Sequence, residues 1–275
     1  MPHGIAEALA IFAAGLAAGT INTVVGSGTL ITFPTLLAFH YPPVLANVSN
    51  NVGLVPGAVS GVHGYRAELR GQAGRVRALS TASLCGGLTG AILLLVLPAQ
   101  AFKAIVPALI GIALVMVVVQ PWLARWVDRR QRNRRGGDDS GADAGLAGGT
   151  PADVAAGGRH VGPLLWLLVF CTGIYGGYFG AAQGVLLIGL LGVWYNESLQ
   201  RVNAAKNVLA GVVNGTAAVV FIAVTHVAWG AAALIAAGSI LGGQLGARVG
   251  RRLPPWGLRL VIVFVGTAAL AKLLA

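Results

Sequence analysis

Apolar runs close to the ~20 residues needed to cross a bilayer recur along this 275-residue chain and predict membrane-spanning helices. The runs expected to span are 5–25, 44–64, 78–97, 102–122, 161–182, 202–224, 231–249 and 258–274. Two further runs, 30–40 and 185–194, follow glycines and are too short to span as straight helices. The pattern predicts an all-α polytopic membrane protein with short broken or re-entrant helices near the midplane.

Composition supports this fold class. Hydrophobic residues make up 56% of the chain and charged residues 10%, whereas a soluble domain has about 25% charged residues. The net charge of +11 comes mostly from arginines between the apolar runs, which is typical of cytoplasmic loops rather than of a nucleic-acid surface. We therefore expect the lipid bilayer as a partner and no nucleic acid. Cys85 and Cys171 stand alone in apolar runs, so neither a disulfide nor a metal site is expected.

The second half of the chain repeats the first. An offset of 158 places Gly15, Gly19 and Gly26 on Gly173, Gly177 and Gly184, and an offset of 156 places Asn47 and Asn51 on Asn203 and Asn207. The offset of 156 also places Gly86, Gly87 and Gly90 on Gly242, Gly243 and Gly246. The sequence therefore predicts a first membrane repeat at 1–124, a basic cytoplasmic stretch and disordered linker at 125–160, and a second repeat at 161–275.

Arginine placement predicts that the two repeats have opposite orientations. Four arginines lie between 66 and 77, before the run at 78–97, whereas the matching loop 225–230 has none. In the second copy, arginines instead follow the matching run, at 248, 251 and 252. Because positive charge marks the cytoplasmic side, we expect an inverted-topology repeat with the linker inside and both termini outside.

Inverted repeats with short, glycine-broken segments at matched positions are typical of a transporter's central site. The candidate substrate-binding residues are amides, hydroxyls and one lysine: Asn22, Ser27, Thr29, Asn47, Asn50 and Asn51 in the first half, and Gln183, Asn203, Lys206 and Asn207 in the second. The alternative is that these side chains hold helices together, or that Lys206 extends toward the cytoplasmic surface. No carboxylate lies in the middle of a run, and we expect no catalytic pair, metal or cofactor.

Four motifs resemble the sulfite exporter TauE/SafE family. They read GTIN at 19–22, VGSGTLITFP at 25–34, ANVSN at 46–50 and NAAKN at 203–207. The resemblance covers essentially the whole chain except the linker, and the second half reads GAAQG at 180–184 where the family often has a glycine run. It implies an inner-membrane permease with two related halves for small, often sulfur-containing, anions.

The function expected from these features is export of a small organic or inorganic anion such as sulfite or a sulfonate. The alternatives are a membrane enzyme or accessory subunit without transport activity, and an anion channel. The sequence is compatible with an oligomer but does not require one.

Overall fold

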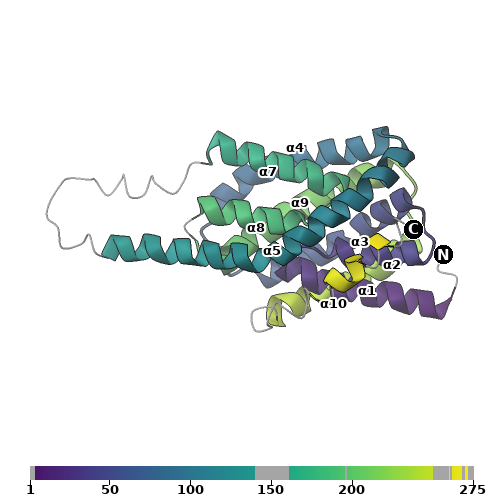
Figure 1. Cartoon of the computed structure of the whole chain (residues 1–275), viewed down its shortest axis with the longest axis horizontal. Coiled ribbons are helices and arrows are strands. Elements are labelled where there is room, and N and C mark those ends of the chain that lie inside the picture. Colours follow the sequence, from purple (N-terminus) through teal and green to yellow (C-terminus); the bar gives the residue numbers. More distant parts are fainter. Residues whose placement is uncertain are drawn as a thin grey trace.

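The computed structural model describes residues 4–139, 161–195 and 197–249, with short pieces between 260 and 271. The regular elements within these residues are α-helices (Figure 1). They are α1 (Ile5–Val24), α2 (Thr29–Ala38), α3 (Pro43–Gly64), α4 (Ala73–Val96), α5 (Ala99–Asp139), α7 (Pro163–Tyr178), α8 (Gln183–Trp194), α9 (Leu199–Val224) and α10 (Trp229–Val249). Five described helices, α1, α4, α5, α9 and α10, are long and apolar enough to cross a membrane. The predicted all-α polytopic fold is confirmed.

Both predicted short segments are short helices that follow a break in the chain. After α1 the backbone turns at Gly26, whose φ of 91° favours glycine, and α2 begins three residues later. After α7 it turns at Gly180, with φ of 73°, and α8 follows. In Figure 1, α1 starts at the right-hand end of the molecule and α7 at the left-hand end, so the two broken segments enter from opposite ends. These directions agree with an inverted repeat, which stays a prediction.

The two halves pack against each other through glycines on α1, α4, α7 and α10, of which α7, with 16 residues, is shorter than the span predicted at 161–182. A β-carbon on Gly19 of α1 would lie under 3.0 Å from the backbone of Ser239 in α10. A β-carbon on Gly177 of α7 would meet the backbone of Gly87 in α4 equally closely. Small residues let membrane helices approach to backbone contact, so helices of one half hold helices of the other.

Glycine contacts bear on the predicted register of the repeat in two ways. A β-carbon on Gly238 would overlap the carbonyl group of Phe12, and one on Gly86 would overlap that of Phe170. Since Phe12 and Phe170 are related by 158 residues, the contacts match Gly86 to Gly238, an offset of 152. The contacts with α3 and α9 instead keep the predicted offset, since a β-carbon on Gly87 would meet Val213 and one on Gly243 would meet Gly57, both pairs being related by 156 residues. Glycines recur every four residues in α10, so both registers find support and the match of Gly86 to Gly242 stays a prediction.

Helix α5 continues well past the apolar run that predicted it. The membrane-spanning part covers Ala99–Trp122, but the helix extends to Asp139. It passes through the predicted boundary at residue 124, so the basic stretch after that boundary begins as helix. The rest of the predicted linker, 140–160, and about half of the predicted run at 258–274 lie outside the described residues, so this division of the chain stays a prediction.

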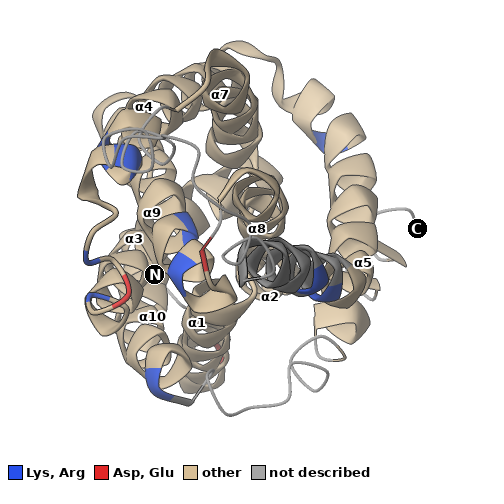
Figure 2. Ribbon diagram, turned by 90° about the vertical axis from the view of Figure 1, so that its left-hand side faces the viewer, with Lys and Arg blue, Asp and Glu red and all other residues tan. Residues whose placement is uncertain are grey.

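Basic residues gather at the end of the molecule from which α7 starts. They include Arg66 and Arg70 before α4, Arg75 and Arg77 in its first turns, Arg201 in α9 and Arg248 in α10. Figure 2 looks at this end and shows basic residues around α4, α9 and α10. By the positive-inside rule we expect this end to face the cytoplasm.

Single cysteines test this orientation in a background without Cys85 and Cys171, both of which are exposed. Gln100→Cys, exposed in the first turn of α5, should react with a membrane-impermeant maleimide added to intact cells. Gly74→Cys, exposed at the start of α4, should react only after permeabilisation. The reverse labelling pattern would show that the arginine-rich end faces outward.

Candidate functional site

The two broken segments meet at one point, where Gly26 contacts Gly184. A β-carbon on either glycine would lie under 3.0 Å from the Cα atom of the other. The Gly184 N–H also donates a hydrogen bond of 3.2 Å to the Gly26 carbonyl oxygen. These residues are equivalent in the two halves by the offset of 158. The contact therefore joins equivalent positions of the two halves, and only glycine fits at either position.

The N-terminal ends of α2 and α8 lie beside this contact. Thr29 begins α2 three residues after Gly26, and Gln183 begins α8 immediately before Gly184. A helix N-terminus carries a partial positive charge from its aligned peptide dipoles and favours anions. Two such ends, from the two halves of the chain, are brought together here.

Two buried donors beside these helix ends have no described hydrogen-bond partner. The Ser27 hydroxyl is 0% exposed, and the side chain of Gln183, whose Nε2 is unpaired, is 3% exposed. A buried polar group without a partner costs about 1–3 kcal/mol. A ligand oxygen that accepted a hydrogen bond from either group would remove that cost, so these donors are the strongest indication of a binding site.

Lys206 lies at the C-terminal end of α1. Its Nζ donates hydrogen bonds of 2.9 Å to the carbonyl oxygen of Asn22 and 3.3 Å to that of Thr23. These carbonyls belong to the last turn of the helix, where the dipole is negative and carbonyls have no partner within the helix. The side chain is 1% exposed, so the alternative that Lys206 extends to the cytoplasmic surface is wrong.

Two asparagines of α9 bind the same helix end as Lys206. Asn203 and Asn207 each donate from Nδ2 to the Thr23 carbonyl oxygen, at 3.1 and 3.3 Å. The Asn203 Oδ1 atom is buried without a described partner. Four predicted site residues, Asn22, Asn203, Lys206 and Asn207, therefore come together at the end of α1.

The asparagines of α3 form hydrogen bonds with different parts of the molecule. Asn47 donates a hydrogen bond of 2.9 Å to the carbonyl oxygen of Tyr178, the last residue of α7, so it caps that helix as the α9 side chains cap α1. Asn50 instead binds within its own half, donating to the Thr29 hydroxyl at 3.3 Å and accepting from the Thr32 hydroxyl. Asn51 is half-buried, and its Oδ1 has no described partner. For Thr29 and Asn50, the structure gives a helix-joining role.

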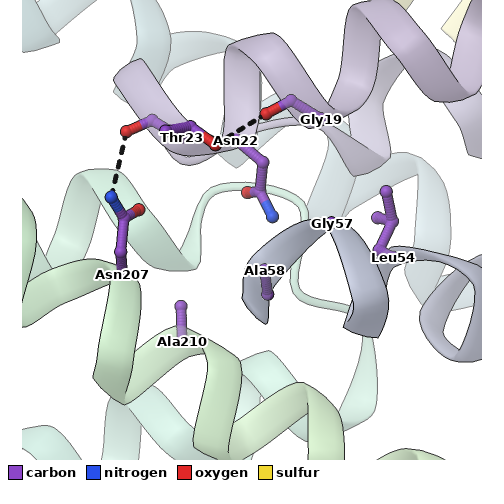
Figure 3. A pocket seen from close by; sticks show the side chains of 8 residues that line it. All are labelled: Gly19, Asn22, Thr23, Leu54, Gly57, Ala58, Asn207 and Ala210. Carbon is purple, nitrogen blue, oxygen red and sulfur yellow. Dashed lines mark hydrogen bonds between the residues drawn. The ribbon is translucent and has the colours of Figure 1, made fainter. Parts of the chain in front are cut away.

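A small cavity of about 10 Å³ lies between α1, α3 and α9 (Figure 3). Its lining residues are Gly19, Asn22, Thr23, Leu54, Gly57, Ala58, Asn207 and Ala210. The Asn22 side chain points into the space between α3 and α9, and the dashed lines in Figure 3 show Asn207 and Gly19 bonded to Thr23. This volume is about what one water molecule requires. The cavity is therefore too small for an anion with three oxygen atoms in the conformation described.

The chain matches the family model "Sulfite exporter TauE/SafE" over residues 11–273. It belongs to this family. TauE/SafE relatives include the probable membrane transporter protein YfcA of Escherichia coli (strain K12), 24% identical over 96% of this chain and 88% of the relative. A probable membrane transporter protein of Haemophilus influenzae is 27% identical over 90% of this chain and 87% of the relative. No solved structure matches the chain significantly.

TauE/SafE membership and the apolar helices make this chain a multi-pass protein of the cell membrane and a member of a membrane transporter family. Within the described residues, no group of three or more His, Cys, Asp or Glu side chains could hold a metal ion.

The sequence did not reveal which acceptors the candidate site residues bind. The partners of Asn47, Asn203, Lys206 and Asn207 are backbone carbonyls, which every residue has. The contact of Gly26 with Gly184 was also missed, although a signal existed. Glycines at equivalent positions beside two helix breaks are what a close approach between two related halves requires.

Proposed function

We propose that this TauE/SafE chain is a permease that exports a small organic or inorganic anion such as sulfite or a sulfonate. One observation carries the proposal. The N-terminal ends of α2 and α8 meet through Gly26 and Gly184, beside two buried donors without partners, Ser27 and Gln183. Helix ends and unpaired donors both favour a negatively charged group with several acceptor oxygens.

The charges of the described residues suit an anion that must leave as well as enter. The described acidic residues lie in the first turn of α1, in the loops before α4 and α9, or in the part of α5 beyond Trp122, and not in the middle of a span. The unpaired donors are neutral side chains. We infer that the site holds its substrate by hydrogen bonds and dipoles, without a carboxylate that would repel it.

Transport requires the closed conformation to open, since the described cavity is too small for the substrate. At the arginine-rich end, Glu197 joins the two halves through an ion pair with Arg75 at 3.5 Å, and it also pairs with Arg201 of its own half at 2.6 Å. These groups are partly exposed, so the pairs are weak and can break. We propose that the halves rock against each other and that this end opens to admit the anion.

Substitutions of the two unpaired donors test the site. In proteoliposomes, Ser27→Ala should weaken the apparent affinity for sulfite or a sulfonate about tenfold or more, because a hydrogen bond to a charged group is lost. Gln183→Glu should reduce flux further, since it places a carboxylate at the binding site. Ser83→Ala is the matched control, because the Ser83 hydroxyl is also buried and unpaired but lies in α4. Equal flux in Ser27→Ala, Gln183→Glu and Ser83→Ala would contradict this site.

The same assay separates the other functions. Saturable flux with counterflow across a panel of sulfite, sulfonates and carboxylates supports a carrier. Flux that rises linearly with concentration indicates an anion channel. Folded protein that moves no anion in the panel would instead favour an enzyme or accessory subunit.

A further inference from the structure

The end of α1 is an oxygen-rich site that the Nζ atom of Lys206 occupies. The Lys206 ammonium group is held by the carbonyl oxygens of Asn22 and Thr23, and the side chain is almost fully buried. The described ion pairs join Glu197 to Arg75 and Arg201, so the bonds described for Lys206 go to neutral oxygens rather than to a carboxylate. Asn203, whose Oδ1 is unpaired, adds a further buried oxygen on the same face of α9.

Such a set of oxygens is also what a small free cation requires. In secondary transporters with broken helices, carbonyls at the C-terminal end of a half-helix coordinate Na⁺. The last turn of α1 has this geometry, since the helix ends at Val24 and the chain turns at Gly26. The Nζ atom of Lys206 lies at the position that a coordinated ion would take.

We propose that Lys206 is a tethered cation that replaces a dissociable coupling ion at the C-terminal end of α1. The inference deepens the proposed function and rests on it. Transport then requires neither Na⁺ nor K⁺, because the positive charge that stabilises this helix end is covalently attached. Removing the ammonium group turns the same oxygens into a binding site for a small monovalent cation.

The first half of the chain lacks this cation. Its equivalent of Lys206 is Asn50, which binds the hydroxyls of Thr29 and Thr32, and the end of α7 receives the neutral amide of Asn47. The two helix breaks therefore differ by one positive charge. The Lys206 side chain bonds to Thr23, four residues before Ser27 in the chain, so its charge also favours an anion beside the ends of α2 and α8.

Chemical rescue tests the tethered cation. In proteoliposomes containing choline as the cation, Lys206→Ala should lose anion flux about tenfold to a hundredfold. Ammonium, methylammonium or Na⁺ should restore much of that flux, whereas wild-type flux should be the same in Na⁺, K⁺ and choline. Lys103→Ala, at an exposed position in α5, is the matched control and should behave as the wild type in every cation.

Cation binding is read separately from transport by thermal unfolding in detergent. Ammonium or Na⁺ should raise the unfolding temperature of Lys206→Ala by several degrees and leave that of the wild type unchanged, because a ligand stabilises only the state that binds it. This measurement tests the role of Lys206 even if the wild type moves no anion in the panel. Such an absence of flux would overturn only the proposed function. Lys206→Met serves if the alanine variant does not fold, since a side chain of similar length leaves less empty space.

Three results would overturn the inference. Wild-type flux that requires Na⁺ would show that a free ion, and not Lys206, provides the coupling charge. A folded Lys206 variant that small cations neither stabilise nor reactivate would show that the oxygens at the end of α1 do not form a cation site. Unchanged flux of Lys206→Ala in choline would show that the charge is not needed.

Discussion

Gly26→Ala and Gly184→Ala should each greatly reduce the amount of folded, transport-competent protein, and Gly26→Ala should be the more severe. A β-carbon at either position would lie under 3.0 Å from backbone atoms of the other broken segment, which have no flexible end to move aside. Forcing extra atoms into a packed region costs about 1–3 kcal/mol. Gly26 also has a φ of 91°, where a side chain adds about 1–2 kcal/mol of backbone strain.

Fluorescence-detected size exclusion and proteoliposome flux measure these effects. Gly111→Ala is the control, because a β-carbon there meets nothing within 4 Å and alanine favours the helix. We expect this variant to express and transport as the wild type does. If Gly26→Ala and Gly184→Ala were indistinguishable from Gly111→Ala, the two broken segments would not be in backbone contact.

Membrane potential alone should drive flux of a singly charged anion. An inside-negative potential contributes about 2.3 kcal/mol per charge per 100 mV. At 1.4 kcal/mol per tenfold change, this corresponds to roughly a fifty-fold gradient. The physical reason is that the described acidic residues are absent from the middle of the spans and that carbonyls of α1 hold the Lys206 ammonium. A proton or Na⁺ gradient is then not needed.

Liposomes loaded with a monovalent sulfonate provide the measurement. A potassium gradient with valinomycin sets the potential, and efflux should follow its sign and magnitude with no gradient of protons or Na⁺. Protein-free liposomes and Gln183→Glu serve as controls, and both should show little efflux. Flux that ignores the potential and depends on a proton gradient would contradict this mechanism.

Hydropathy predicted the bounds of the short apolar helices to within two residues at each end. The run at 185–194 became Gln183–Trp194, and that at 30–40 became Thr29–Ala38. It failed where helices leave the apolar region, because hydropathy reports the membrane and not the backbone. Helix α4 begins at Ala73, five residues before the predicted run, since Arg75 is part of the helix and pairs with Glu197.

The candidate site was predicted as a set of residues but not as an arrangement. Asn203, Lys206 and Asn207 were predicted as candidate site residues, and the structure places all three side chains against the end of α1. Their acceptors are carbonyls exposed by the helix break, which no side-chain pattern identifies. Likewise, the residues of α4 that correspond to those of α10 in the repeat depend on which glycine meets which carbonyl. Glycines that recur every four residues leave that choice open.

The length of α5 makes the chain a practical target for single-particle imaging. From residue 123 to Asp139, at 1.5 Å per residue, the helix extends about 25 Å beyond its membrane-spanning part. A 27.9 kDa membrane protein offers little mass outside a detergent micelle for aligning particle images. A rigid soluble domain fused in helical register onto the end of α5 would stand clear of the micelle and give every particle a visible reference mark.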